Sequence, residues 1–106
     1  MSKTIKTDQK RIIKFENIKI DLNKLSIIKK EKEFKINNTE KIILEKMINN
    51  PGNTFSRENI GQLINLDKER SIDVIITRLR KKIEIDPKNP KFLQTIRGAG
   101  YVLWIE

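Results

Sequence analysis

Short alternating runs of apolar and polar residues fill the first third of the chain. Ile18, Ile20 and Leu22 alternate with polar neighbours, and similar runs recur on both sides of them. A period of two is typical of half-buried β-strands. Residues 12–36 therefore predict three or four short antiparallel strands with one apolar face.

The apolar spacing changes to that of helices after residue 36. Asn37 and Glu40 stand three residues apart, as in a helix capping box, and Pro51-Gly52 ends the first helix. Ser56 is a good cap for a second, shorter helix. The buried sides are expected at Ile43, Leu44, Met47 and Ile48 in the first helix, and at Ile60, Leu63 and Ile64 in the second.

The third predicted helix, residues 70–85, contains neither glycine nor proline and ends before Asp86-Pro87. One apolar stripe recurs at spacings of four, three and four, within about 40° on a helical wheel, and consists of Ile72, Ile76, Leu79 and Ile83. That stripe must face the core. The opposite side collects Arg70, Val74, Thr77, Arg78 and Lys81, with Ser71 and Asp73 on its flanks and Arg80 beyond Asp73.

Two further strands are predicted at the C-terminal end of the chain. Residues 92–96 and 101–105 alternate, and Arg97-Gly98-Ala99-Gly100 joins them. Glycine allows the positive φ that a tight hairpin demands.

Composition excludes several classes of protein. The 106 residues suffice for about one domain, and they include no cysteine and no histidine. The chain therefore lacks disulfides, the usual metal ligands and the usual general base, and we expect neither an enzyme, a cofactor nor a metal site. No apolar run approaches the roughly 18 residues of a membrane span, and no secretory signal is present, so a cytoplasmic protein is expected.

The formal charge of +9 favours a polyanionic partner, but its position matters more than its size. Lysine, isoleucine and asparagine make up 47 of the 106 residues, so much of the lysine excess is compositional bias. The positions of the arginines are more informative than those of the lysines. Four of the six arginines, Arg70, Arg78, Arg80 and Arg97, lie on one helix and one hairpin tip.

Two helices, a short turn, a basic third helix and a glycine-rich hairpin describe a winged helix-turn-helix. Such a helix fits the DNA major groove, where arginine pairs with guanine and Val74 or Thr77 can contact a thymine methyl. Arg97 at the hairpin tip suits the minor groove. Phosphate contacts are expected from Arg70, Ser71, Arg80, Lys81 and Tyr101.

Competing interpretations of the same residues stay open. Any small α+β domain has a basic helix somewhere, and a winged helix can bind a protein instead of DNA. Asp73 and Glu84 are interpreted as surface charges, because nothing in the sequence places them in a cleft. Phe92, Tyr101 and Trp104 are interpreted as packing residues.

The sequence also resembles the C-terminal effector domain of OmpR/PhoB-type response regulators. The resemblance rests on residues 70–84 (RSIDVIITRLRKKIE), on Asp86-Pro87 and Asn89-Pro90, and on residues 94–101 (QTIRGAGY). It covers about residues 12–105, with further matches at Asn50-Pro51-Gly52, residues 55–58 and residues 15–21.

The resemblance implies an α+β winged helix-turn-helix with an N-terminal four-stranded antiparallel sheet, three helices and a C-terminal β-hairpin wing. Residues 70–85 are then the recognition helix. The resemblance places Asp73, Val74, Thr77 and Arg78 against bases, Arg97 in the minor groove, and Arg70, Ser71, Arg80 and Tyr101 on phosphates.

The resemblance implies partners as well. These are double-stranded DNA with direct repeats, bound by a head-to-tail pair, and RNA polymerase, although residues 65–69 lack the aromatic residue of many relatives. Residues 1–11 are interpreted as a flexible leader or interdomain linker, and residues 12–106 as the DNA-binding domain. The chain is then either an effector domain separated from its receiver domain and sensor kinase, or a receiverless stand-alone regulator.

Overall fold

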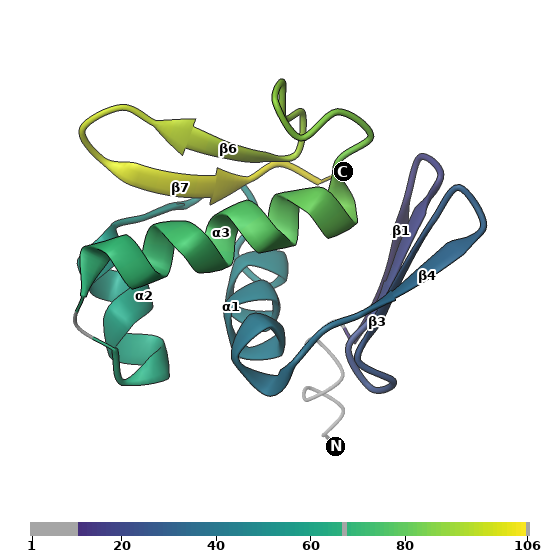
Figure 1. Cartoon of the computed structure of the whole chain (residues 1–106), viewed down its shortest axis with the longest axis horizontal. Helices are drawn as coiled ribbons and strands as arrows, with labels where there is room; N and C mark the ends of the chain where they lie inside the picture. Colours follow the sequence, from purple (N-terminus) through teal and green to yellow (C-terminus); the bar gives the residue numbers. More distant parts are fainter. Residues whose placement is uncertain (1–10, 67, 106) are drawn as a thin grey trace, which may run out of the picture.

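The fold combines two antiparallel sheets with three helices, and the computed structural model describes residues 11–66 and 68–105 (Figure 1). The N-terminal sheet contains β1 (Ile12–Phe15), β2 (Ile18–Asp21), β3 (Ser26–Lys29) and β4 (Lys32–Lys35). The helices are α1 (Asn38–Ile48), α2 (Arg57–Ile64) and α3 (Glu69–Ile83). The C-terminal sheet contains β5 (Thr54–Phe55), β6 (Leu93–Ile96) and β7 (Gly100–Leu103).

The N-terminal sheet is a four-stranded meander in the order β1-β2-β3-β4, which confirms the expected architecture. Lys29 and Lys32 pair across β3 and β4, so the turn itself is only Lys30 and Glu31. Both turn residues have positive φ, 51° and 65°. Positive φ at both residues is typical of the two-residue hairpin turns whose twist matches that of the strands. Here Lys30 and Glu31 adopt this conformation, and neither is glycine.

Helix starts follow the predicted caps. The Asn37 side chain accepts from the backbone N–H of Glu40, and the Glu40 side chain accepts from the backbone N–H of Asn37. Ser56 caps α2 through the backbone N–H of Asn59. The third helix ends at Ile83, two residues before the predicted end, because Glu84 turns to extended backbone.

The wing is a hairpin of β6 and β7 with shorter strands than predicted, and β5 adds a third strand beside β7. The sequence analysis did not predict β5, which is only two residues long. Gly100 has φ +144°, and a Cβ there would lie 2.1 Å from the carbonyl oxygen of Phe55. Glycine is thus what allows β5 to pair with β7.

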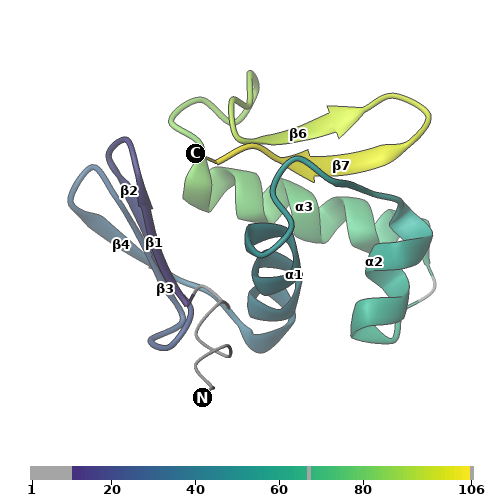
Figure 2. The ribbon, with the colours of Figure 1, turned by 180° about the vertical axis from the view of Figure 1, so that it is seen from behind.

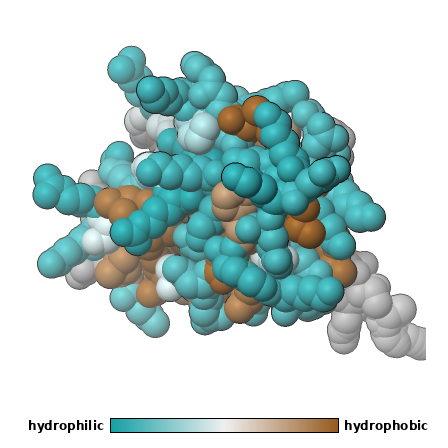
Figure 3. Space-filling view, turned by 45° about the vertical axis from the view of Figure 1, so that its right-hand side comes forward, coloured by the Kyte–Doolittle hydropathy of each residue, from teal (hydrophilic) through white to brown (hydrophobic). Residues whose placement is uncertain are grey.

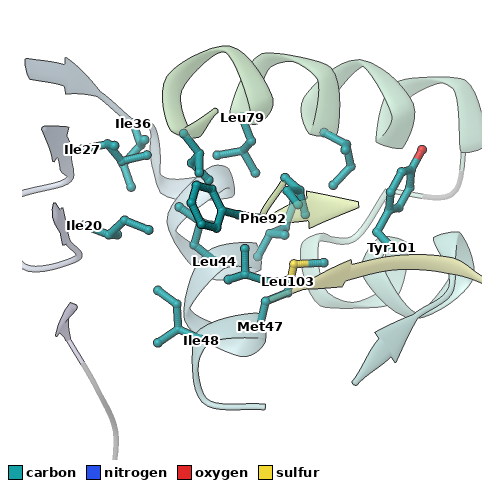
Figure 4. Packing of buried hydrophobic residues seen from close by; sticks show 14 of the residues in the cluster. Ile20, Ile27, Ile36, Leu44, Met47, Ile48, Leu79, Phe92, Tyr101 and Leu103 are labelled. Atoms are coloured by element: carbon teal, nitrogen blue, oxygen red, sulfur yellow. The ribbon is translucent and has the colours of Figure 1, made fainter. Parts of the chain in front are cut away.

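One hydrophobic core joins all these elements (Figure 4). It receives Ile20 and Ile27 from the sheet, the predicted stripe of α1, and Leu79 from α3. Of the three apolar side chains expected on the buried side of α2, Ile60 is fully buried, whereas Leu63 and Ile64 are half-buried. The buried face of α3 is the predicted one: Ile72, Ile76, Leu79 and Ile83 are each at most 1% exposed.

Arg11, the last residue of the expected leader, contacts the folded domain, while residues 1–10 lie outside the described residues. Its guanidinium donates to Glu45 of α1 at 2.6 Å and to Asn23 at 3.1 Å. Its carbonyl accepts from the backbone N–H of Leu22. In the described part of the chain, no helix has the length and apolar character that crossing a membrane requires.

Candidate nucleic-acid interface

Helix α3 crosses the molecule with one long side uncovered. Figure 1 shows it in front of α1, with α2 at its N-terminal end, the four-stranded sheet at its C-terminal end and the wing along its upper edge. Seen from behind, in Figure 2, α1 and α2 lie in front of α3. The uncovered side is therefore the one opposite the buried isoleucine stripe.

A shallow depression on this uncovered side gathers six of the predicted contact residues. All four residues expected to face bases line it, together with two of those expected on phosphates. Val74 is 42% exposed although it is apolar. The lining residues are Arg70, Asp73, Val74, Thr77, Arg78 and Lys81.

The charge of the depression is strongly positive. Three of its six lining residues are cations, and Asp73 is its one acid. Among the described acidic side chains, none forms a salt bridge with Arg70, Arg78 or Lys81. Thr77 is exposed, and its hydroxyl donates to the backbone carbonyl of Asp73 at 2.9 Å.

Asp73 is held by two donors from other elements. The Arg57 Nε at the start of α2 lies 2.8 Å from its Oδ1, and the Tyr101 hydroxyl of β7 donates to the same oxygen. Figure 4 shows the Tyr101 hydroxyl directed toward α3. This Arg57–Asp73–Tyr101 cluster ties α2 and the wing to α3. The sequence analysis did not predict Arg57 as a site residue. The one signal in the sequence is that an arginine stands at the first residue of a predicted helix.

The cluster shifts the pKa values of its three members. Desolvation acts to raise the pKa of Asp73, but the hydrogen bonds from Arg57 and Tyr101 outweigh it and lower that pKa. The hydrogen bond to Asp73 raises the pKa of Arg57. Burial, followed by the hydrogen bond to Asp73, raises the pKa of Tyr101. The carboxylate is therefore ionised and the phenol neutral over the whole physiological range.

Arg80 is also engaged within the protein. Its Nε donates to the Leu93 carbonyl at 2.8 Å and its Nη2 to the Thr95 hydroxyl at 2.7 Å. Its guanidinium also lies over the Tyr101 ring, 5.6 Å from the centroid. Tyr101 itself is 5% exposed. The two residues place their polar groups between α3 and the wing rather than in the depression.

Ser71 and Arg97 occupy different surroundings from the depression. Ser71 is half-buried in the first turn of α3. Arg97 is exposed at the tip of the wing, and the following Gly98 has φ +77°. The structure therefore presents two separate basic features, the depression on α3 and the hairpin tip.

The expectation that Glu84 is a surface charge was wrong. It is 1% exposed, and its carboxylate accepts from the backbone N–H groups of Lys91, Phe92 and Leu93 at 2.7 to 3.3 Å. Lys29 of β3 donates to its carbonyl at 2.6 Å. The Glu84 carboxylate thus supplies hydrogen-bond acceptors for the backbone N–H groups of the segment that leads into β6. These bonds fix where the wing starts.

Aromatic residues near the wing serve mostly in packing, as predicted. Phe15 and Phe92 meet edge to face with centroids 4.8 Å apart. Trp104 differs because it is 47% exposed, and its indole N–H donates to the Gln94 side chain. Figure 3 shows one face of the molecule covered mainly by hydrophilic residues, with separate apolar areas between them. In the described ranges, no group of three or more acidic side chains is placed to hold a metal ion.

Comparison with known proteins identifies relatives along most of the chain. Residues 31–103 match the family described as "Transcriptional regulatory protein, C terminal". The chain is 40% identical over 98 residues to the probable transcriptional regulator ycf27 of Guillardia theta. That match covers 86% of this chain and 38% of the relative, so the chain spans less than half the length of that protein.

Solved structures with the same fold include whole regulators and isolated domains. The response regulator DrrB of Thermotoga maritima, an OmpR/PhoB homologue, superposes with a TM-score of 0.82 at 29% identity, over 94% of this chain and 47% of that chain. The DNA-binding domain of the response regulator AdeR, solved in complex with an intercistronic region, superposes with a TM-score of 0.68 at 30% identity. That superposition covers 89% of this chain and 100% of the AdeR domain.

Proposed function

Because the chain belongs to the family of transcriptional regulatory protein C-terminal domains and has the OmpR/PhoB-type winged-helix fold, we propose that it binds double-stranded DNA. In this proposal it is the sequence-specific effector domain of a two-component response regulator and catalyses no reaction. The carrying observation is the exposed side of α3, where Arg70, Arg78 and Lys81 surround Val74 and Thr77 without a described acidic partner.

The major groove is the proposed site for α3. Arg78 has the donors for a guanine edge, and the methyl groups of Val74 and Thr77 suit thymine. Arg70, Ser71 and Lys81 flank them and are proposed to bind phosphates, which set the register of the helix on the duplex.

The minor groove is the proposed site for the wing tip. Arg97 is exposed there, and a narrow A·T-rich minor groove concentrates negative potential. Arg80 and Tyr101 are proposed to act by supporting the wing, since their polar groups already have partners inside the protein.

Further partners follow from the relatives and are part of the proposal. Response regulators pair an effector domain with a phosphate-accepting receiver domain, and the curated relative is more than twice as long as the match. A head-to-tail pair on direct repeats and a contact with RNA polymerase are proposed from the resemblance to OmpR/PhoB-type regulators.

A salt series on A·T-rich duplexes with direct repeats tests the DNA-binding proposal. We expect log K to fall steeply with log salt, by about 0.9 per phosphate neutralised. Arg78→Ala should cost about 1–3 kcal/mol and relax preference at one base pair. Lys46→Ala, which removes an exposed cation from α1, is the matched control. It should change neither the affinity for the duplex nor the base preference. Absence of duplex binding at low salt would favour a protein-interaction module instead.

A further inference from the structure

The first strand of the wing, β6, has a strand neighbour on one side only. The order in the C-terminal sheet is β5-β7-β6, so among the described residues no strand pairs with the other edge of β6. An unpaired strand edge is a weak point unless other groups cover it. At the start of β6, side chains from the C-terminal end of α3 take that place.

Leu93, the first residue of β6, gives both of its backbone polar groups to these side chains. Its N–H donates to the Glu84 carboxylate at 2.7 Å, and its carbonyl accepts from the Arg80 Nε at 2.8 Å. The backbones of Arg80 and Glu84 are joined as well, because the N–H of Glu84 donates to the Arg80 carbonyl at 2.8 Å. Leu93 is therefore held between two side chains from consecutive turns at the end of α3.

The Glu84 side of this contact is buried and requires a carboxylate. Glu84 is 1% exposed and Leu93 is fully buried. Both carboxylate oxygens accept from backbone N–H groups: Oε1 from Lys91 at 2.7 Å, and Oε2 from Phe92 and Leu93 at 3.0 and 2.7 Å. A carboxamide has only one oxygen, and its NH2 group would face a backbone donor. Glutamine therefore keeps the size of this side chain but loses part of its bonding.

The direction of β6 at its start matters for DNA binding because the wing is long compared with its base. Arg78 lies on the uncovered side of α3, less than two helical turns before Glu84. Arg97, at the wing tip, follows directly after β6. A change in the direction of β6 at Leu93 is carried along the strand to Arg97. It therefore alters the distance between the two arginines that are aimed at different grooves.

On the basis of the proposed DNA-binding function, we propose that Glu84 is a positioning residue, which fixes the distance between Arg78 in the major groove and Arg97 in the minor groove. Glu84 is buried, so it acts on DNA only through these two residues. A wing that is already oriented loses less conformational entropy when it binds. Without the carboxylate the wing must be ordered during binding, and the contact made by Arg97 becomes weaker.

A double-mutant cycle of Glu84→Gln and Arg97→Ala tests the proposal, on the A·T-rich duplexes with direct repeats at one salt concentration. In the unmodified chain, Arg97→Ala should weaken binding about ten-fold. In the Glu84→Gln chain, the same change should weaken binding about two-fold or less, because Arg97 no longer contributes fully. Glu84→Gln alone should weaken binding about five-fold.

Two controls separate positioning from other effects of the substitution. Glu33→Gln removes one exposed carboxylate from β4, on the N-terminal sheet, and changes the net charge equally. Ile20→Ala destabilises the fold from the same sheet, because Ile20 is fully buried. In both of these chains, Arg97→Ala should keep its effect of about ten-fold. Circular dichroism verifies that each variant is folded under the conditions of the binding measurement.

Amide hydrogen exchange tests the proposal on the unmodified chain, even if Glu84→Gln does not fold. The N–H groups of Phe92 and Leu93 should exchange as slowly as those of the central strand β7, because the Glu84 carboxylate holds them. Rapid exchange at Phe92 and Leu93 would mean that Glu84 does not hold the wing in solution, and it would overturn the inference.

Three outcomes of the cycle overturn the inference while leaving the DNA-binding proposal intact. One is an Arg97→Ala effect of the same size with and without Glu84, which means that Glu84 only stabilises the fold. Another is an equal reduction of that effect by Ile20→Ala, which means that any loss of stability loosens the wing. The third is an Arg97→Ala chain that binds as tightly as the unmodified one. An unmodified chain that binds no duplex defeats the proposed function itself.

Discussion

At the scale of the residue, the arginines divide into two groups that the sequence alone does not separate. Arg70, Arg78 and Arg97 have no described acidic partner, while the guanidinium groups of Arg57 and Arg80 bond to other groups of the protein. The helical wheel predicts which side of α3 each residue occupies. It does not predict the reach of Arg80 to the Leu93 carbonyl, because that partner comes from a strand whose position depends on the whole fold.

Tyr101 is the only tyrosine of the chain, so its ionisation can be followed without interference. We expect its absorbance titration to give a pKa above the ordinary value of 10.0, because burial and the bond to Asp73 both disfavour the phenolate. The neutral hydroxyl therefore contributes stability that is complete below pH 10.0 and is lost as the pH rises through the raised pKa.

The Asp73→Ala variant separates the two causes of that shift. Its Tyr101 pKa should fall part of the way toward 10.0, since burial remains and only the carboxylate is lost. Glu33→Ala should leave the titration unchanged. A midpoint that is the same in the wild-type chain and in Asp73→Ala would mean that the hydroxyl does not bond to Asp73 in solution.

At the scale of the element, local chemistry predicts more than packing does. The capping residues Asn37 and Ser56 and the stripe of α3 follow from spacing alone, because each depends on atoms within one helix. The strand β5 and the burial of Glu84 do not. Both depend on segments that meet only in the folded chain, such as Phe55 beside Gly100.

The two glycines of the wing turn should respond differently to alanine. Gly98→Ala meets no atom within 4 Å and should cost about 1–2 kcal/mol, the price of a positive φ. Gly100→Ala also drives its Cβ into the Phe55 carbonyl and should cost on the order of 3 kcal/mol or more. Urea unfolding followed by circular dichroism measures both, and equal losses would contradict the observed contact between β5 and β7.

At the scale of the whole molecule, one core connects the N-terminal sheet to the wing. Ile20 and Leu103 come from opposite ends of the chain and share the same cluster. Polar links reinforce this connection: Lys82 of α3 binds Glu40 of α1 at 2.8 Å, and Lys29 of β3 binds the carbonyls at the end of α3. We therefore expect the chain to unfold as a single cooperative unit.

Ile20→Ala tests whether the chain unfolds as one cooperative unit, because Ile20 lies in the N-terminal sheet and the fluorescent probe, Trp104, lies beside the wing. Ile20 is fully buried, and its truncation should cost about 2–4 kcal/mol. The loss should appear equally in circular dichroism and in the fluorescence of Trp104, which follows the wing. Ile12→Ala, at a position that is 51% exposed on β1, should cost well under ~1 kcal/mol. A Trp104 transition unmoved by Ile20→Ala would show that the sheet unfolds separately.

The bonding of the Arg80 guanidinium limits which substitutions this sequence can accept. Its planar group serves a carbonyl, a hydroxyl and an aromatic face at once, and Arg11 likewise serves two partners in different directions. A lysine ammonium cannot reproduce such a fork. In a chain where lysine supplies 17 of the 23 basic residues, exchange of arginine for lysine is therefore neutral only where charge alone matters.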